Sequence, residues 1–255
     1  MGMTADTASI TVRLARDEAD LIAAQRLRYQ VFIEELGGTG DLVDHDRELE
    51  RDRFDPFFDH LIALDATANG RVVGVYRMLR QEKAREAGQF YSEGEYDLST
   101  LKASGRRLLE LGRSCLHADY RGGPVMFHLW QALADYVAHH EIEVLFGVAS
   151  FHGTDAQALA APLSLLHHRH LAPSDLRVRS KRHQPMDLID EAALDRKSAM
   201  LAIPALIKAY LRLGGFVGEG AYIDHAFNTT DVCLIMDTGR MNERQKALYS
   251  PGPTS

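Results

Sequence analysis

A strand, a glycine-rich turn and a helix follow one another within residues 108–140, and this unit limits most strongly how the chain can fold. Apolar residues dominate residues 108–116, which predicts a strand. Pro124 then begins a helix, because proline is tolerated at the first helical position, where its missing N–H has no helical partner. Apolar residues at helical spacing extend this helix to His140. Units of this kind build α/β folds, in which helices cover a sheet.

The turn of this unit has the composition of a phosphate-binding loop. Arg121, Gly122 and Gly123 precede the helix, and glycines allow an anion to approach the backbone closely. The N–H groups at a helix N-terminus favour that anion as well. A tight turn without a ligand would have the same sequence, so these three residues alone leave both interpretations open. The turn matches neither the P-loop pattern nor the Rossmann G-x-G-x-x-G.

Two charged residues interrupt the apolar strand that precedes the turn. Glu110 and Arg113 would point to opposite faces of a regular strand. Gly112 lies between them, and an isolated glycine in a strand often marks a bulge, which would bring both charges to one face. The alternative is an edge strand with two solvated charges. The apolar residues on either side favour the bulge.

The rest of the chain supplies strands and helices in an order that predicts a mixed sheet flanked by helices, an α/β fold. Hydrophobic patterning predicts strands over residues 10–16, 60–66, 71–79, 143–151, 216–224 and 231–236. It predicts helices over residues 17–36, 124–140, 155–170 and 205–213, with helical patches between residues 82 and 104. Asp17 is the expected N-cap of the first helix, and Asn69-Gly70 the turn of a hairpin.

A long acidic connection over residues 37–59 joins the first helix to this hairpin. We expect Glu50 and most of its other acids to be solvated. Asp52 and Asp55 differ because they lie among three phenylalanines, which would anchor this part of the loop to the protein body. Loops this long in compact domains tend to be functional or disordered. Anchored carboxylates would suit recognition of an amine.

A basic cluster stands out in an acidic chain of formal charge −7, a charge that argues against general nucleic-acid binding. Its members are Arg177, Arg179, Lys181 and Arg182, with no acid among them. A solvated loop would account for the cluster. A docking surface for an acidic partner would account for it equally well, since complementary charge steers association.

The cysteines and the hydropathy of the chain indicate in which cellular compartment the protein is found. Cys115 and Cys233 fall in predicted strands and are expected to be reduced, which predicts a cytoplasmic protein. We expect no signal peptide from the first residues, and no apolar run is long enough to predict a membrane span. Histidines at 139–140 and 167–170 lack the spacing of a ligand set, so we expect no metal site.

The central strand and turn resemble those of the GNAT superfamily of N-acyltransferases. Residues 110–121, Glu-Leu-Gly-Arg-Ser-Cys-Leu-His-Ala-Asp-Tyr-Arg, carry this resemblance, which extends over roughly residues 10–237. Residues 115–121, 150–155 and 204–232 look most like the ornithine-lipid type of acyltransferase, which N-acylates ornithine from an acyl carrier protein. The acyl-homoserine lactone synthases resemble the chain more distantly.

The lactone synthases' site residues match seven positions of this chain, although Leu109 stands where those enzymes usually have Trp, and Gly37-Gly38 replaces a second Trp. The matching positions are Arg28, Phe32, Asp52, Asp55, Arg77, Glu110 and Arg113.

The resemblance implies transfer of a 3-hydroxyacyl chain from the phosphopantetheine of acyl carrier protein to the α-amine of ornithine, without a permanently bound cofactor. Glu110 and Arg113 would be catalytic, with Glu110 the general base, acting directly or through a water. Backbone near Cys115 and Leu116 would polarise the thioester, and residues 121–123 would bind the phosphate. Acceptor binding would fall to Arg28, Phe32, Asp52, Asp55 and Arg77, and carrier-protein docking to Arg177, Arg179, Lys181 and Arg182.

The resemblance further predicts one acyltransferase domain over residues 10–238, with an insertion at about 155–203 and tails at 1–9 and 239–255. A lipid product would place the protein at the inner face of the membrane. Three other functions stay open: a lactone synthase that uses S-adenosylmethionine, an N-acetyltransferase that uses acetyl-CoA, and a non-catalytic acyl-binding module.

Overall fold

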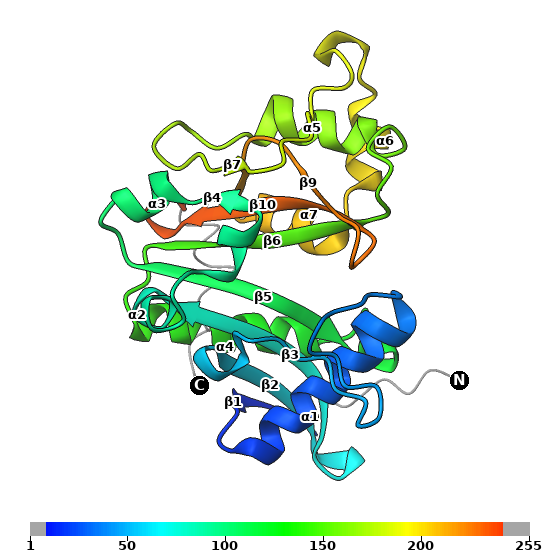
Figure 1. Cartoon of the computed structure of the whole chain (residues 1–255), viewed down its shortest axis with the longest axis vertical. Helices are drawn as coiled ribbons and strands as arrows, with labels where there is room; N and C mark the ends of the chain where they lie inside the picture. The colour runs from blue at the N-terminus through cyan, green and yellow to red at the C-terminus, as the bar shows by residue number, and fades with distance from the viewer. Residues whose placement is uncertain (1–8, 242–255) are drawn as a thin grey trace. The chain divides into compact units, whose positions relative to one another are not determined.

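The computed structural model describes residues 9–241 and consists of two compact units (Figure 1). Among the described residues, unit 1 contains residues 9–87 and Leu111–His140, and unit 2 contains Gly88–Glu110 and residues 141–241. Strand β5 (Leu108–Leu116) passes from unit 2 into unit 1. The predicted single domain with its insertion stays a prediction. Residues 1–8 and 242–255, which make up most of both predicted tails, lie outside the described residues.

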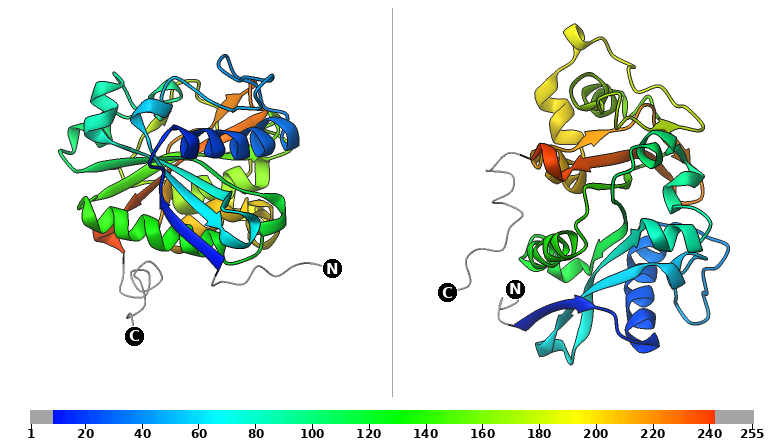
Figure 2. Two further views of the ribbon diagram at one scale, coloured as in Figure 1. Left: turned by 90° about the horizontal axis from the view of Figure 1, so that it is seen from below. Right: turned by 90° about the vertical axis from the view of Figure 1, so that its left-hand side faces the viewer.

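Unit 1 is built on antiparallel strands. β1 (Ile10–Leu14), β2 (Asp59–Asp65) and β3 (Arg71–Arg80) pair in this order, as the hairpin pattern predicted, and β5 follows β3. Helix α1 (Glu18–Arg28) covers one face of these strands and α4 (Val125–His139) the other (Figure 2). Short α2 (Gln81–Glu86) follows β3.

Consecutive residues of β3 show why this layer forms. Val75 is fully buried in the apolar cluster beneath α1, together with Ala24 and Leu27. Gly74 points to the opposite face, as strand geometry requires. A Cβ at Gly74 would lie 2.8 Å from the Leu116 side chain of β5 and 3.0 Å from the Leu129 side chain of α4, so glycine lets helix and sheet approach closely here.

The first helix differs from its prediction in one respect. Asp17 caps α1 as expected, accepting from the N–H of Asp20 at 2.9 Å. Helical structure runs almost to residue 36, as predicted, but the α-helix ends at Arg28 and continues as a π-helix, η2 (Tyr29–Glu35). π-helical turns are rare and frequently occur at functional sites. This one follows directly on a buried arginine.

Unit 2 contains a mixed sheet, as predicted. β5 pairs in parallel with β6 (Val144–His152) through Leu108–Glu110, and β10 (Thr229–Asp237) pairs antiparallel along all of β6. The strand predicted over residues 216–224 is broken into β8 (Phe216–Val217) and β9 (Tyr222–Asp224). Gly220 lies between them with φ of +76°, which a regular strand does not accommodate.

Two helices of unit 2 differ from the predictions. α5 (Ala160–His170) begins later than residue 155, so Pro162 lies in its first turn and does not kink it. α6 (Arg196–Ala202) was missed because its flanking sequence lacks periodicity, whereas α7 (Ala205–Arg212) was predicted. The unit also contains α3 (Ser99–Ala103) and the small sheet of β4 (Tyr96–Asp97) and β7 (Arg179–Ser180). Among the helices of residues 9–241, none has the length and apolar character needed to cross a bilayer.

Candidate active site

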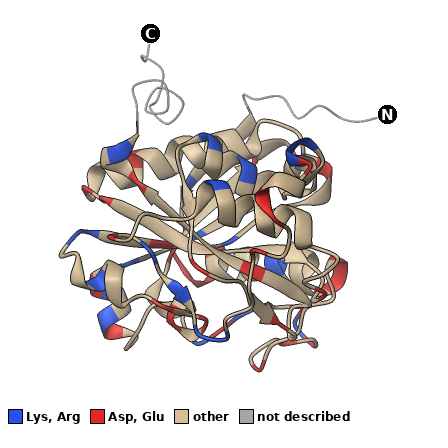
Figure 3. Ribbon diagram, turned by 90° about the horizontal axis from the view of Figure 1, so that it is seen from above, with Lys and Arg blue, Asp and Glu red and all other residues tan. Residues whose placement is uncertain are grey.

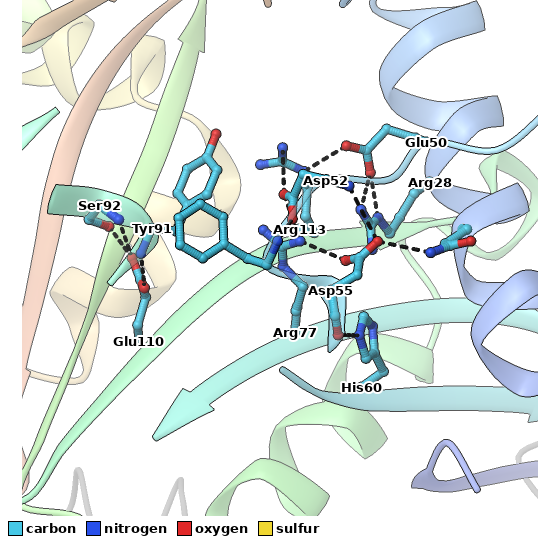
Figure 4. Close-up of polar contacts among 12 residues, drawn as sticks. Arg28, Glu50, Asp52, Asp55, His60, Arg77, Tyr91, Ser92, Glu110 and Arg113 are labelled. Atoms are coloured by element: carbon cyan, nitrogen blue, oxygen red, sulfur yellow. Dashed lines mark hydrogen bonds and ion pairs between the residues drawn. The ribbon is translucent and has the colours of Figure 1, made fainter. Parts of the chain in front are cut away.

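Six charged side chains form a buried ionic cluster in unit 1 (Figure 4). Three are guanidinium groups from α1, β3 and β5, and three are carboxylates from the loop before β2. The ionic cluster consists of Arg28, Arg77, Arg113, Glu50, Asp52 and Asp55.

Asp55 lies at the centre of this ionic cluster. Its Oδ1 accepts from Nη1 of Arg28 and from Nη1 of Arg77, both at 2.7 Å, and its Oδ2 accepts from Gln25 at 2.9 Å. Arg28 and Arg77 are 0% and 1% exposed. Two such buried charges require partners, since a desolvated guanidinium is costly unless it is paired and hydrogen bonded. Phe54 and Phe58 are buried, and the Arg77 Cζ lies 4.1 Å from the centre of the Phe58 ring, which confirms that aromatic residues anchor this loop.

Arg113 joins the ionic cluster through an unusual backbone conformation. Its φ is +49°, whereas Gly112 does not have a positive φ, so the left-handed residue of β5 is the arginine and not the glycine. This conformation costs a non-glycine residue about 1–3 kcal/mol and often marks functional sites. The guanidinium lies 3.2 Å from Glu50 and 3.5 Å from Asp52, and its Cζ is 5.9 Å from the centre of the Phe32 ring.

Glu50 was predicted to be solvated, and that prediction is wrong. The residue is 1% exposed, and its Oε2 accepts from Nε of Arg28 at 2.5 Å. Burial opposes ionisation of this carboxyl group, but the charges of Arg113 and Arg28 outweigh it and lower its pKa to about 2. The same balance, between burial and the charges of Arg28 and Arg77, holds the pKa of Asp55 well below its usual range.

His60 supports the ionic cluster from β2. Its Nε2 donates to the carbonyl oxygen of Asp55 at 3.1 Å. Burial lowers its pKa to about 4, even though the Asp55 carboxylate acts in the opposite direction. The imidazole is therefore neutral near pH 7.

Mild acid is expected to destabilise the protein through His60. Its folded pKa of about 4 lies below the ordinary 6.5, so between these values the unfolded chain binds the proton more tightly and stability falls as the pH is lowered. The loss should approach on the order of 3 kcal/mol, and Glu50 adds a second loss between its ordinary 4.5 and about 2. Urea denaturation of His60→Gln should show a weaker pH dependence between pH 6.5 and 4. Exposed His225→Gln is the control, and an unchanged slope in His60→Gln would contradict the assignment.

Glu110 lies in unit 2, where three donors hold its carboxylate (Figure 4). The N–H of Tyr91 donates to Oε2 at 2.7 Å, and the N–H and Oγ of Ser92 donate to Oε1 at 2.6 and 2.5 Å. The residue is 1% exposed. Three donors match an ionised carboxylate, which only accepts hydrogen bonds. Glu110 thereby fixes the start of η5 (Tyr91–Gly94), a contact that no sequence pattern indicated.

The glycine turn lies where the strand–turn–helix pattern placed it. Gly122 has φ of +75°, a conformation that glycine adopts without strain. Pro124 is the N-cap of α4 and not its first residue. Arg121 donates through Nε to the Leu116 carbonyl at 3.2 Å and through Nη2 to Glu35 at 2.5 Å. The guanidinium is thus positioned next to the turn while remaining half exposed.

Cys115 and His117 lie just before the glycine turn, and both are buried. The Cys115 thiol is buried, and burial raises its pKa to about 12, so it stays protonated at neutral pH. His117 is buried as well, with Nδ1 accepting from the N–H of Asp119 at 3.3 Å and Nε2 3.3 Å from the Gln30 amide. Burial lowers the pKa of His117. The burial of this histidine was not predicted from the sequence.

The basic cluster of residues 177–182 lies around β7 in unit 2. Arg177 donates to the Ala172 carbonyl at 2.7 Å, and Lys181 donates to the Glu93 carbonyl. Arg179, whose side chain is 64% exposed, lies 3.7 Å from Glu219. Arg182 lies with its Cζ 5.8 Å from the Tyr222 ring centre.

A carboxylate trio in unit 2 was not indicated by any sequence spacing. Glu95, Asp224 and Asp231 each place an oxygen within 4.8 Å of the others. Oxygen ligands of this kind suit hard cations.

The chain is similar to curated proteins along nearly its whole length. An L-ornithine N(alpha)-acyltransferase of Rhodobacter capsulatus is 60% identical over 252 residues, which cover 97% of each chain. The L-ornithine N(alpha)-acyltransferase of Brucella abortus is 44% identical over 249 residues, covering 94% of this chain and 89% of the relative. The family described as the Acetyltransferase (GNAT) domain matches residues 27–131.

Solved structures share the fold at much lower identity. The CoA-dependent acyl-homoserine lactone synthase BjaI has a TM-score of 0.53 and 13% identity, over 96% of this chain and 90% of that one. The AHL synthase LasI has a TM-score of 0.51 and 15% identity, over 96% of this chain and 98% of that one. Together with the matching domain family, these similarities confirm the predicted GNAT-like fold.

Proposed function

The chain belongs to the L-ornithine N(alpha)-acyltransferase family, and we propose that it transfers a 3-hydroxyacyl chain from acyl carrier protein to the α-amine of ornithine. The observation that carries the proposal is 60% identity to an enzyme of that name over 97% of the chain. The product is an N-acyl ornithine, a lyso-ornithine lipid. The bond formed is an amide, and the bond broken is the thioester C–S bond, so the leaving group is the thiol of phosphopantetheine.

The ionic cluster offers the acceptor site that this reaction requires. Ornithine presents ammonium groups and a carboxylate, which carboxylate and guanidinium side chains recognise by charge-assisted hydrogen bonds. Asp52 and Arg113 retain 19% and 12% side-chain exposure, whereas Arg28 and Asp55 are almost fully enclosed. We therefore assign Asp52 and Arg113 to direct contact with the substrate. Arg28, Asp55 and Arg77 hold those two residues in place, and Phe32 packs beside Arg113.

The chemical step needs a deprotonated amine, a polarised thioester and a bound phosphate. Glu110 is the proposed general base, oriented by its three hydrogen bonds. Backbone near Cys115 and Leu116 is assigned to the thioester carbonyl, and Arg121, Gly122 and Gly123 to the phosphate of phosphopantetheine. A Cys115 thiol that stays protonated fits direct transfer to the amine without an acyl-enzyme. No permanently bound cofactor is required.

Incubation of purified protein with 3-hydroxyacyl carrier protein and a panel of amines tests this function. Mass spectrometry should detect N-acyl ornithine as the main product. Product formation that requires S-adenosylmethionine would identify a lactone synthase, and transfer only from acetyl-CoA would identify an acetyltransferase. Carrier-protein binding without any product would reduce the protein to an acyl-binding module.

We propose the basic cluster as the dock for the carrier protein, which is acidic in this family. Replacement of Arg179 and Arg182 by Glu is expected to raise KM for the acyl carrier protein at least tenfold, because like charges then meet at the surface. Activity on a short pantetheine thioester should be retained. Arg26→Glu with Arg47→Glu reproduces the charge change elsewhere as the control. An equal loss on both donors would exclude a docking role.

A further inference from the structure

A stretch of unit 2 carries only positive charge. Residues 196–218 contain four basic and no acidic residues, in a chain of formal charge −7. The stretch comprises α6, the corner at Ile203-Pro204, and α7 (Figure 1). Figure 3 shows the basic and acidic residues along the ribbon. Neither the acceptor site nor the phosphate turn uses this segment.

α7 presents its polar and apolar residues on opposite faces. Ile207 and Tyr210 are buried on one face. Ala205, Lys208 and Arg212 are spaced three and four apart, so they share the other face, and Ala205 and Arg212 are exposed. The outward face of this helix therefore combines small apolar side chains with two cations.

α6 continues that face around the corner. Leu201 is 71% exposed, more than any other large hydrophobic residue described between 9 and 241. Lys197 lies one turn before it, on the same side of the helix. The ammonium of Lys208 donates to the Leu201 carbonyl at 3.3 Å, which joins the two helices into one corner surface. We define this corner surface by Lys197, Leu201, Ala205, Lys208 and Arg212.

Acids near the corner surface are engaged elsewhere. Glu191 lies 2.6 Å from Arg169 and 3.3 Å from Arg196, and Asp195 caps α6 through the N–H groups of Lys197 and Ser198. Within residues 9–241, neither Lys197 nor Lys208 has a carboxylate within 4.0 Å. Arg196 is therefore not counted in the corner surface. Lys197 is exposed, and Lys208 is partly buried with its ammonium on the Leu201 carbonyl.

We propose that the corner surface binds the surface of an anionic lipid bilayer. An exposed leucine flanked by cations is the arrangement by which interfacial helices insert an apolar residue while their charges contact anionic headgroups. The exposed Leu201 side chain does not favour solubility in water. A partner without negative charge would gain no electrostatic attraction from Lys197 and Lys208. This inference goes beyond acyl transfer, and binding can be measured without either substrate.

Vesicle flotation with the full chain tests the proposal. Wild-type protein should float with vesicles of phosphatidylcholine mixed with phosphatidylglycerol, and should not float with phosphatidylcholine alone. Replacing one lysine should lower the partition coefficient of the protein onto anionic vesicles about fivefold. The double variant Lys197→Ser, Lys208→Ser should therefore lower it by about 25-fold. Leu201→Ser should lower it by about tenfold or more, and raised salt should weaken wild-type binding but not remove the effect of Leu201.

The matched control removes one exposed leucine and two lysines elsewhere, as Leu14→Ser with Lys83→Ser and Lys102→Ser, and should bind as wild type does. Thermal unfolding shows that each variant is folded. Equal binding to both vesicle types, or equal loss in the control, would overturn the proposal. Failure of wild-type protein to bind vesicles, with carrier-dependent activity lost in the Lys197→Ser, Lys208→Ser variant, would assign the surface to the carrier protein instead and also overturn it.

Discussion

Asn in place of Asp55 is expected to lower the free energy of unfolding by about 3–5 kcal/mol. The carboxylate bridges Arg28 and Arg77, whose guanidinium groups both lie 2.7 Å from Oδ1. Removing its charge leaves a buried cluster of three guanidinium groups and two carboxylates. Water cannot solvate the excess positive charge, because Arg28 and Arg77 are only 0% and 1% exposed. Urea denaturation followed by circular dichroism measures the loss.

Asp44→Asn is the control for this substitution. Asp44 lies 3.3 Å from Arg51, whose side chain is 41% exposed, so the pair should contribute less than about 1 kcal/mol. A loss below about 1 kcal/mol in Asp55→Asn would show that the ionic cluster tolerates an uncompensated charge. In that case Asp55 would not hold Arg28 and Arg77 in place for the acceptor.

The Glu110→Gln substitution is expected to lower kcat by about 10²–10⁴-fold, the usual contribution of a general base. Glutamine keeps the size of the side chain but cannot take a proton from the amine. The loss should become smaller above about pH 8, where the α-amine itself begins to lose its proton. Single-turnover rates with the acyl carrier protein donor, measured from pH 6 to pH 10, show both effects.

Ser92→Ala separates the base from the support that Glu110 provides for its loop. This substitution removes one of the three donors to the carboxylate and leaves both backbone N–H groups in place. We expect a loss of less than about tenfold, the scale of one hydrogen bond to a charged group. If Ser92→Ala matches Glu110→Gln in size and in pH profile, the carboxylate acts by positioning the Tyr91–Ser92 segment and is not the base.

The membership of the ionic cluster was partly readable from the sequence. Asp52 and Asp55 lie among phenylalanines, so the local pattern indicated a part of the loop that is anchored to the protein body. Arg28 was identified only through the family resemblance. Glu50 had no such pattern around it, and it was assigned to solvent with the other acids. Its burial follows from contacts with Arg28 and Arg113, residues 22 and 63 positions away.

The backbone of β5 shows a second limit of pattern reasoning. A glycine between two charges indicated a bulge at Gly112, since glycine adopts a left-handed conformation at the lowest cost. The structure places that conformation at Arg113. Ion pairs with Glu50 and Asp52 offset its cost, and such pairs form only once β5 and the loop before β2 are folded together.

Periodicity and turn chemistry were sufficient for the strands of unit 1, the hairpin, the strand–turn–helix unit and a mixed sheet flanked by helices, because these follow from interactions within a few residues. The GNAT-like fold was predicted from the resemblance. Resemblance along the chain was sufficient for the family. The partners of Glu110, the burial of Glu50 and His60, and the joining of α6 to α7 arose only from folding. The partners of Glu50 and Glu110 are 18 to 63 positions away in the sequence, and no local pattern encodes which of several carboxylates will become buried beside a guanidinium.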